Sequence, residues 1–317
     1  MLKKSSLPFI LRLLISLTIF AMVFNIVNVK EVASLLKKLN LWMLLVPFVF
    51  TLLNLVFAGI SFRILLSPFK VKLPLFLMMK YLLYVLAIRS FLPSNLGDLS
   101  LVYFLHLEKL PSTDGVLVFF LDKLSSLIIG IVLAIPSMYI FSFKLETSTI
   151  APILLLTFLI LALLLFFAKK CNFAEKNIFF NSIISKIKPF IATFSLYFKN
   201  HAPILALVLL FTLIRWLLST FPIYFIFSHL GYTVNFIKIL SINALIIALS
   251  LLPVTIGGLG IREASAVLLY KKIGLPADVV FSTFLLLLFL NYVFVCIGAT
   301  IFIFEKRLTF WHKKAPS

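Results

Sequence analysis

Long apolar runs are the feature that most constrains the fold of this 317-residue chain. A helix rises about 1.5 Å per residue, so about 20 apolar residues cross the ~30 Å hydrocarbon core of a bilayer. The chain is 63% hydrophobic and only 12% charged, with a mean hydropathy of +1.19. Soluble domains are about half apolar and a quarter charged. The sequence therefore predicts an all-α integral membrane protein with no soluble catalytic domain.

Some apolar runs are continuous and others are broken. Pro removes a backbone donor and Gly weakens a helix, so a break within lipid persists only where protein or water satisfies the freed backbone groups. We therefore expect six full transmembrane helices and two re-entrant helical hairpins, or ten crossings if each short piece spans by itself. The continuous runs are residues 7–27, 41–62, 116–141, 150–168, 202–227 and 279–304, and the broken regions are residues 75–107 and 236–270.

The break in the first hairpin recurs in the second. Residues 92–98 and 252–258 share the pattern Leu-Pro-x-x-x-Gly, and each hairpin is followed by another Leu-Pro and a long run. Each half is then a span, an amphipathic connector typical of an interfacial helix, a span, a hairpin and a span. Three spans per half place the halves in opposite orientations. We therefore expect one membrane domain, residues 1–317, built as an inverted repeat of residues 1–143 and 150–305. The two connectors are residues 28–40 and 178–200.

The formal net charge of +19 comes from Lys and Arg that lie mainly in the loops between apolar runs. There they set topology, so the charge does not indicate nucleic-acid binding. Their bias favours cytoplasmic termini in the plasma membrane and puts the two hairpins on opposite sides. The four histidines are scattered and the two cysteines lie far apart. No catalytic motif, metal site or cofactor is predicted.

Several charged residues fall inside the predicted spans, where each costs at least ~2.5 kcal/mol unless it has a partner, water or a route to the interface. Asp122 and Lys123 lie early in a span, which fits an interfacial ion pair, snorkelling or the lining of a pathway. Arg215 lies mid-span beside Trp216 and is expected to face the interior.

The second half-helix of the second hairpin begins with the adjacent pair Arg262 and Glu263. Free amides and the positive end of the helix dipole favour an anion there, such as a lipid phosphate. Neighbouring helical positions point about 100° apart, so the two side chains are not expected to neutralise only each other. They either bind substrate or form an ion pair with another helix. The same site would include the glycines at the break, Gly257, Gly258 and Gly260.

The corresponding place in the first hairpin carries Asp98, with Asn95 close before it. Asn95 can donate and accept hydrogen bonds through its amide. Asp98 has two interpretations, a helix cap or a member of the site. Arg89, three residues before the break, would serve a site at the hairpin tip or pair with Asp98.

Residues 252–263, followed by Leu275-Pro276, resemble the motif of the lysylphosphatidylglycerol synthase transmembrane family, also called flippase-like. The first half resembles that family's Pro-x-x-x-Gly-Glu and Glu-Arg patterns, with Asp98 and Asp122 in place of Glu and Lys123 in place of Arg. The resemblance covers nearly the whole chain and implies a lipid-handling membrane protein. In multiple peptide resistance factors the related region moves aminoacylated phospholipids between leaflets, and a following soluble domain makes the lipid. That domain is not expected here.

The leading hypothesis is a flippase or transporter of an anionic phospholipid or a polyprenyl-phosphate-linked intermediate. Arg262, Arg215 and Lys123 would bind the anion, and Glu263 or Asp98 would couple to protons or bind an amine. One alternative is a membrane-embedded transferase with Asp98 and Glu263 as acid and base. Another is a non-catalytic partner of envelope-lipid biosynthetic enzymes. Membrane lipids are the expected ligands in the leading hypothesis.

Overall fold

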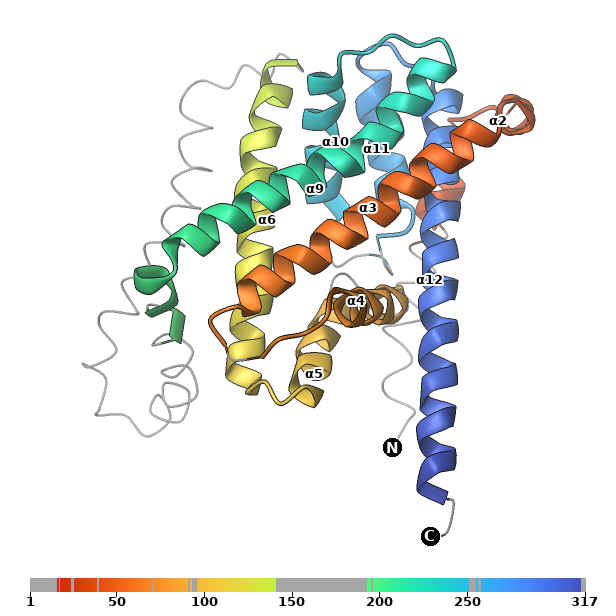
Figure 1. Cartoon of the computed structure of the whole chain (residues 1–317). Coiled ribbons are helices and arrows are strands. Elements are labelled where there is room, and N and C mark those ends of the chain that lie inside the picture. Colours follow the sequence, from red (N-terminus) through yellow and green to blue (C-terminus); the bar gives the residue numbers. More distant parts are fainter. Residues whose placement is uncertain are drawn as a thin grey trace, which may run out of the picture.

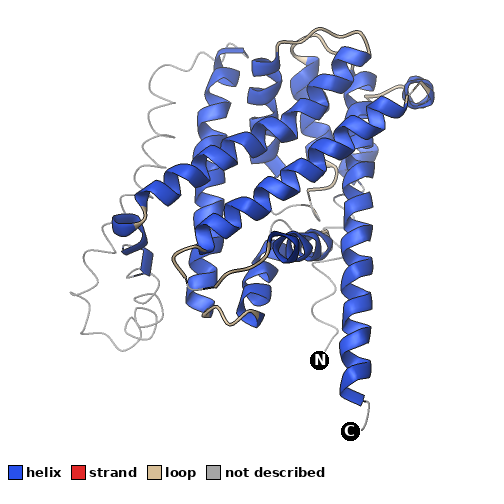
Figure 2. Cartoon of the chain, viewed as in Figure 1, coloured by secondary structure: helices blue, strands red, loops and turns tan. Residues whose placement is uncertain are grey.

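All the regular secondary structure in the described part of the chain is helical, as predicted (Figure 2). The computed structural model describes residues 16, 18–23, 26–38, 40–69, 71–90, 92, 96–140, 193–194, 196–250, 255 and 258–314, without the side chains of 138–140 and 306–314. The elements labelled in Figure 1, with the 3₁₀ turn η1, are α2 (Val29–Lys37), α3 (Leu41–Leu66), α4 (Leu75–Arg89), η1 (Leu96–Leu99), α5 (Ser100–Leu107), α6 (Ser112–Ile140), α9 (Ala202–His229), α10 (Phe236–Ser250), α11 (Ile261–Lys271) and α12 (Ala277–Lys314).

Four helices are long and apolar enough to cross a bilayer, which confirms a multi-pass membrane protein. They correspond to four of the six predicted spans and extend past most of the predicted ends, because a helix continues into polar residues beyond the apolar run. The predicted span 150–168 lies outside the described residues, and of the predicted span 7–27 the stretch 18–23 is described and helical. The four spanning stretches are Leu41–Leu66, Ser112–Ser137, Ala202–His229 and Ala277–Glu305.

Both broken regions consist of a longer helix followed by a shorter one. The first legs, α4 and α10, have 15 residues each, about 22 Å of helix, which is short of the ~30 Å hydrocarbon core. The second legs, α5 and α11, have 8 and 11 residues. Figure 1 shows α5 near one end of the bundle and α11 near the other. Asn95 and Gly257, within the breaks, lie outside the described residues.

The long helices form an antiparallel frame around the hairpins. In Figure 1, α3 and α9 cross the same face in opposite directions, while α6 and α12 run in opposite directions along the two sides. Helix α3 packs on α9, α4 packs on α12, and α10 packs on α6. Gly298 of α12 lies directly against the backbone of Leu83 in α4, where any Cβ atom would clash with the Leu83 carbonyl oxygen. Small residues allow this close approach of helices in membranes.

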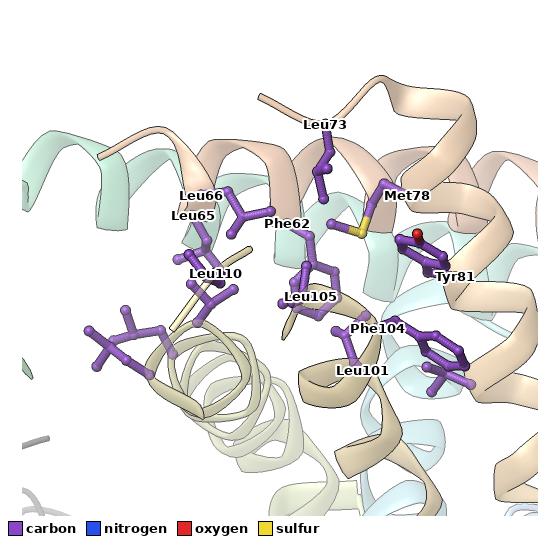
Figure 3. Close-up of a cluster of buried hydrophobic side chains, with 14 of the residues drawn as sticks. Phe62, Leu65, Leu66, Leu73, Met78, Tyr81, Leu101, Phe104, Leu105 and Leu110 are labelled. Atoms are coloured by element: carbon purple, nitrogen blue, oxygen red, sulfur yellow. The ribbon is translucent and has the colours of Figure 1, made fainter. Parts of the chain in front are cut away.

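Each hairpin is packed in its own apolar cluster. The first cluster surrounds α4 and α5, with Leu105 and Leu110 at its centre and Met78 facing them (Figure 3). The second surrounds α10 and α11, and it also contains Val32 of α2. Val29, the first residue of α2, is 55% exposed. Of the second connector, 193–194 and 196–200 are described and helical.

Candidate functional site

The carboxylate of the first hairpin tip is neutralised by cations from two other elements. Asp98 lies in η1 and is 5% exposed. The Lys123 Nζ atom of α6 donates to Asp98 Oδ2 at 2.6 Å, and the Arg89 Nη1 atom of α4 lies 3.7 Å from Asp98 Oδ1. The cap interpretation of Asp98 is wrong, because α5 has Leu99 at its N-cap position and no side-chain cap. Arg89 pairs with Asp98, which is the second of its two expected roles.

Gly97 brings this carboxylate to Arg89. A Cβ atom at Gly97 would overlap the Arg89 backbone, with the Arg89 nitrogen only 2.7 Å away. Glycine has no Cβ, so the chain returns directly against the last turn of α4 after the break. The next residue, Asp98, is thereby held beside the arginine that ends α4.

A second buried ion pair joins α6 to α9. Arg215 Nη1 donates to Asp122 Oδ1 at 2.8 Å, and Asp122 is 2% exposed. The Arg215 carbonyl accepts a hydrogen bond of 2.8 Å from Asn54 Nδ2 of α3, so three spanning helices meet at this residue. Arg215 points into the bundle, as its mid-span position predicts. The neighbours Asp122 and Lys123 bind different helices rather than each other, because adjacent helical positions diverge by about 100°.

The carboxylate of the second hairpin tip is held by its own backbone. Glu263 is 1% exposed, and its Oε2 atom accepts a 2.8 Å hydrogen bond from the Gly260 amide at the start of α11. Gly260 has a φ of 86°, and an added Cβ would lie 3.0 Å from the Ser16 carbonyl oxygen. This is the reciprocal half of a capping box. Neither expected role of Glu263 included it, although a glycine at N-cap with Glu three positions later is the sequence signal for it.

Arg262 has no ion-pair partner within the part of the chain that the structure describes. Its guanidinium carbon lies 5.7 Å from the centre of the Phe284 ring on α12, a cation–π distance. Its Nε atom is buried without a hydrogen-bond partner among the described residues. The neighbouring Glu263 carboxylate attracts the guanidinium, and Arg89 of the first hairpin repels it more weakly.

These groups do not cancel in charge. A buried charge without a partner is costly, and it is more so in a membrane domain. The arrangement therefore suits an anionic ligand near the tips of the hairpins. The cations are Arg89, Lys123, Arg215 and Arg262 and the carboxylates are Asp98, Asp122 and Glu263, which leaves one positive charge in excess (4 − 3 = 1).

A separate polar cluster at the Glu305 end of α12 was not found from the sequence. Lys80 Nζ of α4 lies 2.8 Å from Glu305 Oε1, and the Tyr84 hydroxyl donates to the other oxygen of the same carboxylate. The Tyr81 hydroxyl donates to Glu108 at the end of α5. These contacts tie α4 to α12 and to α5. The two contacts of Glu305 join residues more than 200 positions apart, which no local pattern reveals.

The expected motif residues that are described lie at the starts of the half-helices, and comparison with known families gives this placement a context. A family model, the lysylphosphatidylglycerol synthase TM region, matches residues 9–299. The chain belongs to this family. Both hairpins fall within the match, as do the charged residues of the site. Comparison with curated protein sequences gives no significant match. The described residues contain no group of three or more His, Cys, Asp or Glu side chains suited to a metal ion.

Proposed function

We propose that this membrane domain moves an anionic lipid between the two leaflets and binds its headgroup where the hairpin tips meet. The observation that carries the proposal is the excess positive charge of the site, with Arg262 unpaired among the described residues and near Arg89. A lipid phosphate would supply the missing negative charge. Guanidinium and ammonium groups are the side chains that bind phosphate most strongly.

The exposure of the cations also supports anion binding. The side chains of Arg89 and Lys123 are 39% and 40% exposed, whereas the Asp98 side chain between them is 6% exposed. Both cations therefore keep an accessible side while the carboxylate lies beneath them. The start of α11, where Gly260 and Arg262 lie, adds the positive end of a helix dipole.

The transferase alternative fits less well. It requires Asp98 or Glu263 to take a proton from a substrate, and a general base must be within hydrogen-bond reach of that proton. Asp98 is occupied by Lys123, and Glu263 by the Gly260 amide. Both carboxylates serve structure and charge in this conformation, which favours a binding site over a catalytic one.

The proposal includes the inverted repeat and the re-entrant hairpins. In the inverted repeat, the helices of the first half, α3, α4, α5 and α6, would correspond in order to α9, α10, α11 and α12. Under this correspondence, the packing of α4 on α12 becomes that of α10 on α6. The contact of α4 with α5 becomes that of α10 with α11, and α5 on α6 becomes α11 on α12. The two hairpins would enter from opposite sides of the plasma membrane, with both termini cytoplasmic.

Labelling of single cysteines tests this topology. In a background without native cysteines, Leu107→Cys at the end of α5 and Lys271→Cys at the end of α11 should react with an impermeant maleimide from opposite sides of sealed vesicles. Both native residues are exposed. Reaction of both from the same side would contradict the inverted arrangement.

The function itself is tested with purified protein in phosphatidylcholine liposomes that contain a trace of fluorescent phosphatidylglycerol. Dithionite quenches the outer leaflet, so protein-dependent exchange between leaflets appears as additional quenching. Wild type should accelerate exchange and Arg262→Gln should abolish it. Lys37→Gln, which removes an exposed cation of α2 outside the site, is the matched control and should behave as wild type.

Two outcomes would favour the alternatives. A new lipid product in mass spectra of the same liposomes would indicate a transferase. Wild-type activity of Arg262→Ala and Glu263→Ala in cells, without leaflet exchange in liposomes, would indicate a non-transporting partner of envelope-lipid enzymes.

A further inference from the structure

We propose that Asp98 sets the net charge of the headgroup site and so selects lipids with one negative phosphodiester charge over phosphomonoester or diphosphate lipids. This inference rests on the proposed function, because it names the substrate class of that same site. Asp98 is then a specificity-determining residue rather than a proton carrier.

The geometry places Asp98 under the cations that would hold the phosphate. Lys123 binds one oxygen of its carboxylate at 2.6 Å and Arg89 lies 3.7 Å from the other. Asp98 is buried, while about two-fifths of each cation side chain stays exposed. A ligand can therefore reach the outer sides of Arg89 and Lys123 without displacing Asp98. The carboxylate acts as a fixed negative charge behind the binding surface.

The net charge of the site follows from its members. Arg215 and Asp122 form their own buried pair and cancel. The remaining cations are Arg89, Lys123 and Arg262 and the remaining carboxylates are Asp98 and Glu263, so the site carries one positive charge (3 − 2 = +1).

A lipid with one negative phosphodiester charge brings the net charge of the site to zero. A phosphomonoester with two charges, or a diphosphate with more, leaves uncompensated negative charge in a membrane interior, where such charge is costly. The fixed carboxylate of Asp98 makes this cost specific to the more highly charged headgroups, because it repels them at the place where they bind.

The second hairpin has no equivalent carboxylate at this position. By the shared Leu-Pro-x-x-x-Gly pattern, the residue matching Asp98 is Gly258, which has a φ of 76° and no side chain. Charge selection is therefore built into one hairpin, and the other contributes Arg262, a cation without an ion pair among the described residues. Substitution of Asp98 should change selectivity while leaving the second tip as it is.

Leaflet exchange of two fluorescent lipids tests the inference. Phosphatidylglycerol carries one charge, and phosphatidic acid carries two at mildly alkaline pH. In phosphatidylcholine liposomes, wild type should exchange phosphatidylglycerol about tenfold faster than phosphatidic acid, since one uncompensated charge in a partly buried site is worth at least that factor. Asp98→Asn raises the site to +2 and should reverse the preference.

The matched control is Glu305→Gln, which removes the same charge from the ion pair with Lys80, near the other end of α4, and should keep the wild-type preference. Addition of inorganic phosphate separates a lipid site from a site for free phosphate. Phosphate in excess should leave the exchange of phosphatidylglycerol unchanged, and strong competition would overturn the assignment to a lipid.

The outcomes separate the two proposals. Exchange of neither lipid by wild type would overturn the proposed function. Exchange of both lipids at equal rates by wild type would leave the proposed function standing and overturn charge selection by Asp98. Equal rates for the two lipids can be measured with wild type alone, so this result remains decisive if Asp98→Asn does not fold. An unchanged lipid preference in folded Asp98→Asn would also overturn charge selection by Asp98.

Discussion

Asp98 in the first hairpin and Glu263 in the second are both buried carboxylates near the start of a half-helix, but their partners differ. Asp98 is held by Lys123 of α6 and Arg89 of α4. Glu263 is held by the amide of Gly260, three residues earlier in its own chain segment. The first tip depends on the assembly of the bundle, whereas the second is closed by local geometry.

This difference explains why Arg262 has no ion-pair partner among the described residues. Since Glu263 is used by its own backbone, it is not available to Arg262 as a hydrogen-bonded ion pair. In the first hairpin the opposite holds, because the carboxylate and cations neutralise each other in part. By formal charge the first tip carries +1, from Arg89 and Lys123 against Asp98, and the second tip is neutral, although Arg262 and Glu263 form no salt bridge with each other. Four measurements test this comparison, in order of decreasing effect.

The largest effect is expected at Asp122, the most deeply buried ion-paired carboxylate described, which serves as a reference for both tips. Arg215→Ala leaves Asp122 unpaired at 2% exposure. Breaking a buried pair in this way costs about 3–5 kcal/mol. The free energy of unfolding, measured by SDS titration in mixed micelles, should fall by this amount, and Arg215→Ala with Asp122→Ala should recover part of it. A loss below about 1 kcal/mol would mean that the pair is solvated, as surface pairs are.

Asp98→Ala should have the next largest effect. It leaves Lys123 and Arg89 without their carboxylate, but both side chains are about two-fifths exposed and can stay hydrated. We expect a loss of about 2 kcal/mol, less than for a fully buried pair. The same titration measures it, and Lys80→Ala, which breaks the more exposed pair with Glu305, is the control with a smaller loss. If Asp98→Ala lowers the free energy of unfolding as much as Arg215→Ala does, then water is excluded from the first tip as fully as from the α6–α9 interface.

Glu263 distinguishes a cap from an ion pair. Glu263→Gln keeps an oxygen that accepts from the Gly260 amide, whereas Glu263→Ala removes the cap, which is worth about 1 kcal/mol. The alanine variant should therefore unfold more easily and the glutamine variant should stay near wild type. Equal losses for the two variants would indicate that the negative charge, and not the hydrogen bond, holds the second tip.

The smallest effect concerns a carboxyl group outside the spanning helices. The pKa of Glu31 in α2 is raised because its side chain hydrogen-bonds to Asp278 and is repelled by that residue's charge. A raised folded-state pKa means that the contribution to stability is fully present below the ordinary carboxyl pKa and is lost as the pH rises through the raised value. The Tm of wild type should fall slightly over this pH range relative to that of Glu31→Gln. Identical pH profiles would show that the two carboxyl groups do not interact in solution.

The sequence predicted the fold class and the places of the breaks because these depend on local properties. Apolar length located α3, α6, α9 and α12, and Pro and Gly located the ends of α4 and α10. It also identified the charged residues of the site, since charges inside apolar runs are conspicuous. It did not identify the partner of Lys123, because none of the roles expected for Lys123 connected it to Asp98. The cap by Glu263 was missed, although its spacing was present in the sequence.

The sequence alone determined that this chain is a helical membrane protein with two hairpins broken by Pro and Gly. The reason is that backbone groups in lipid must be hydrogen-bonded within helices. Only the tertiary structure decided which cation meets which carboxylate. The partners Arg215 and Asp122 lie 93 positions apart, and Lys123 and Asp98 lie 25 positions apart on different elements. Their distances follow from how α4, α6 and α9 pack, and packing decides which charge at the two hairpin tips is left over for a ligand.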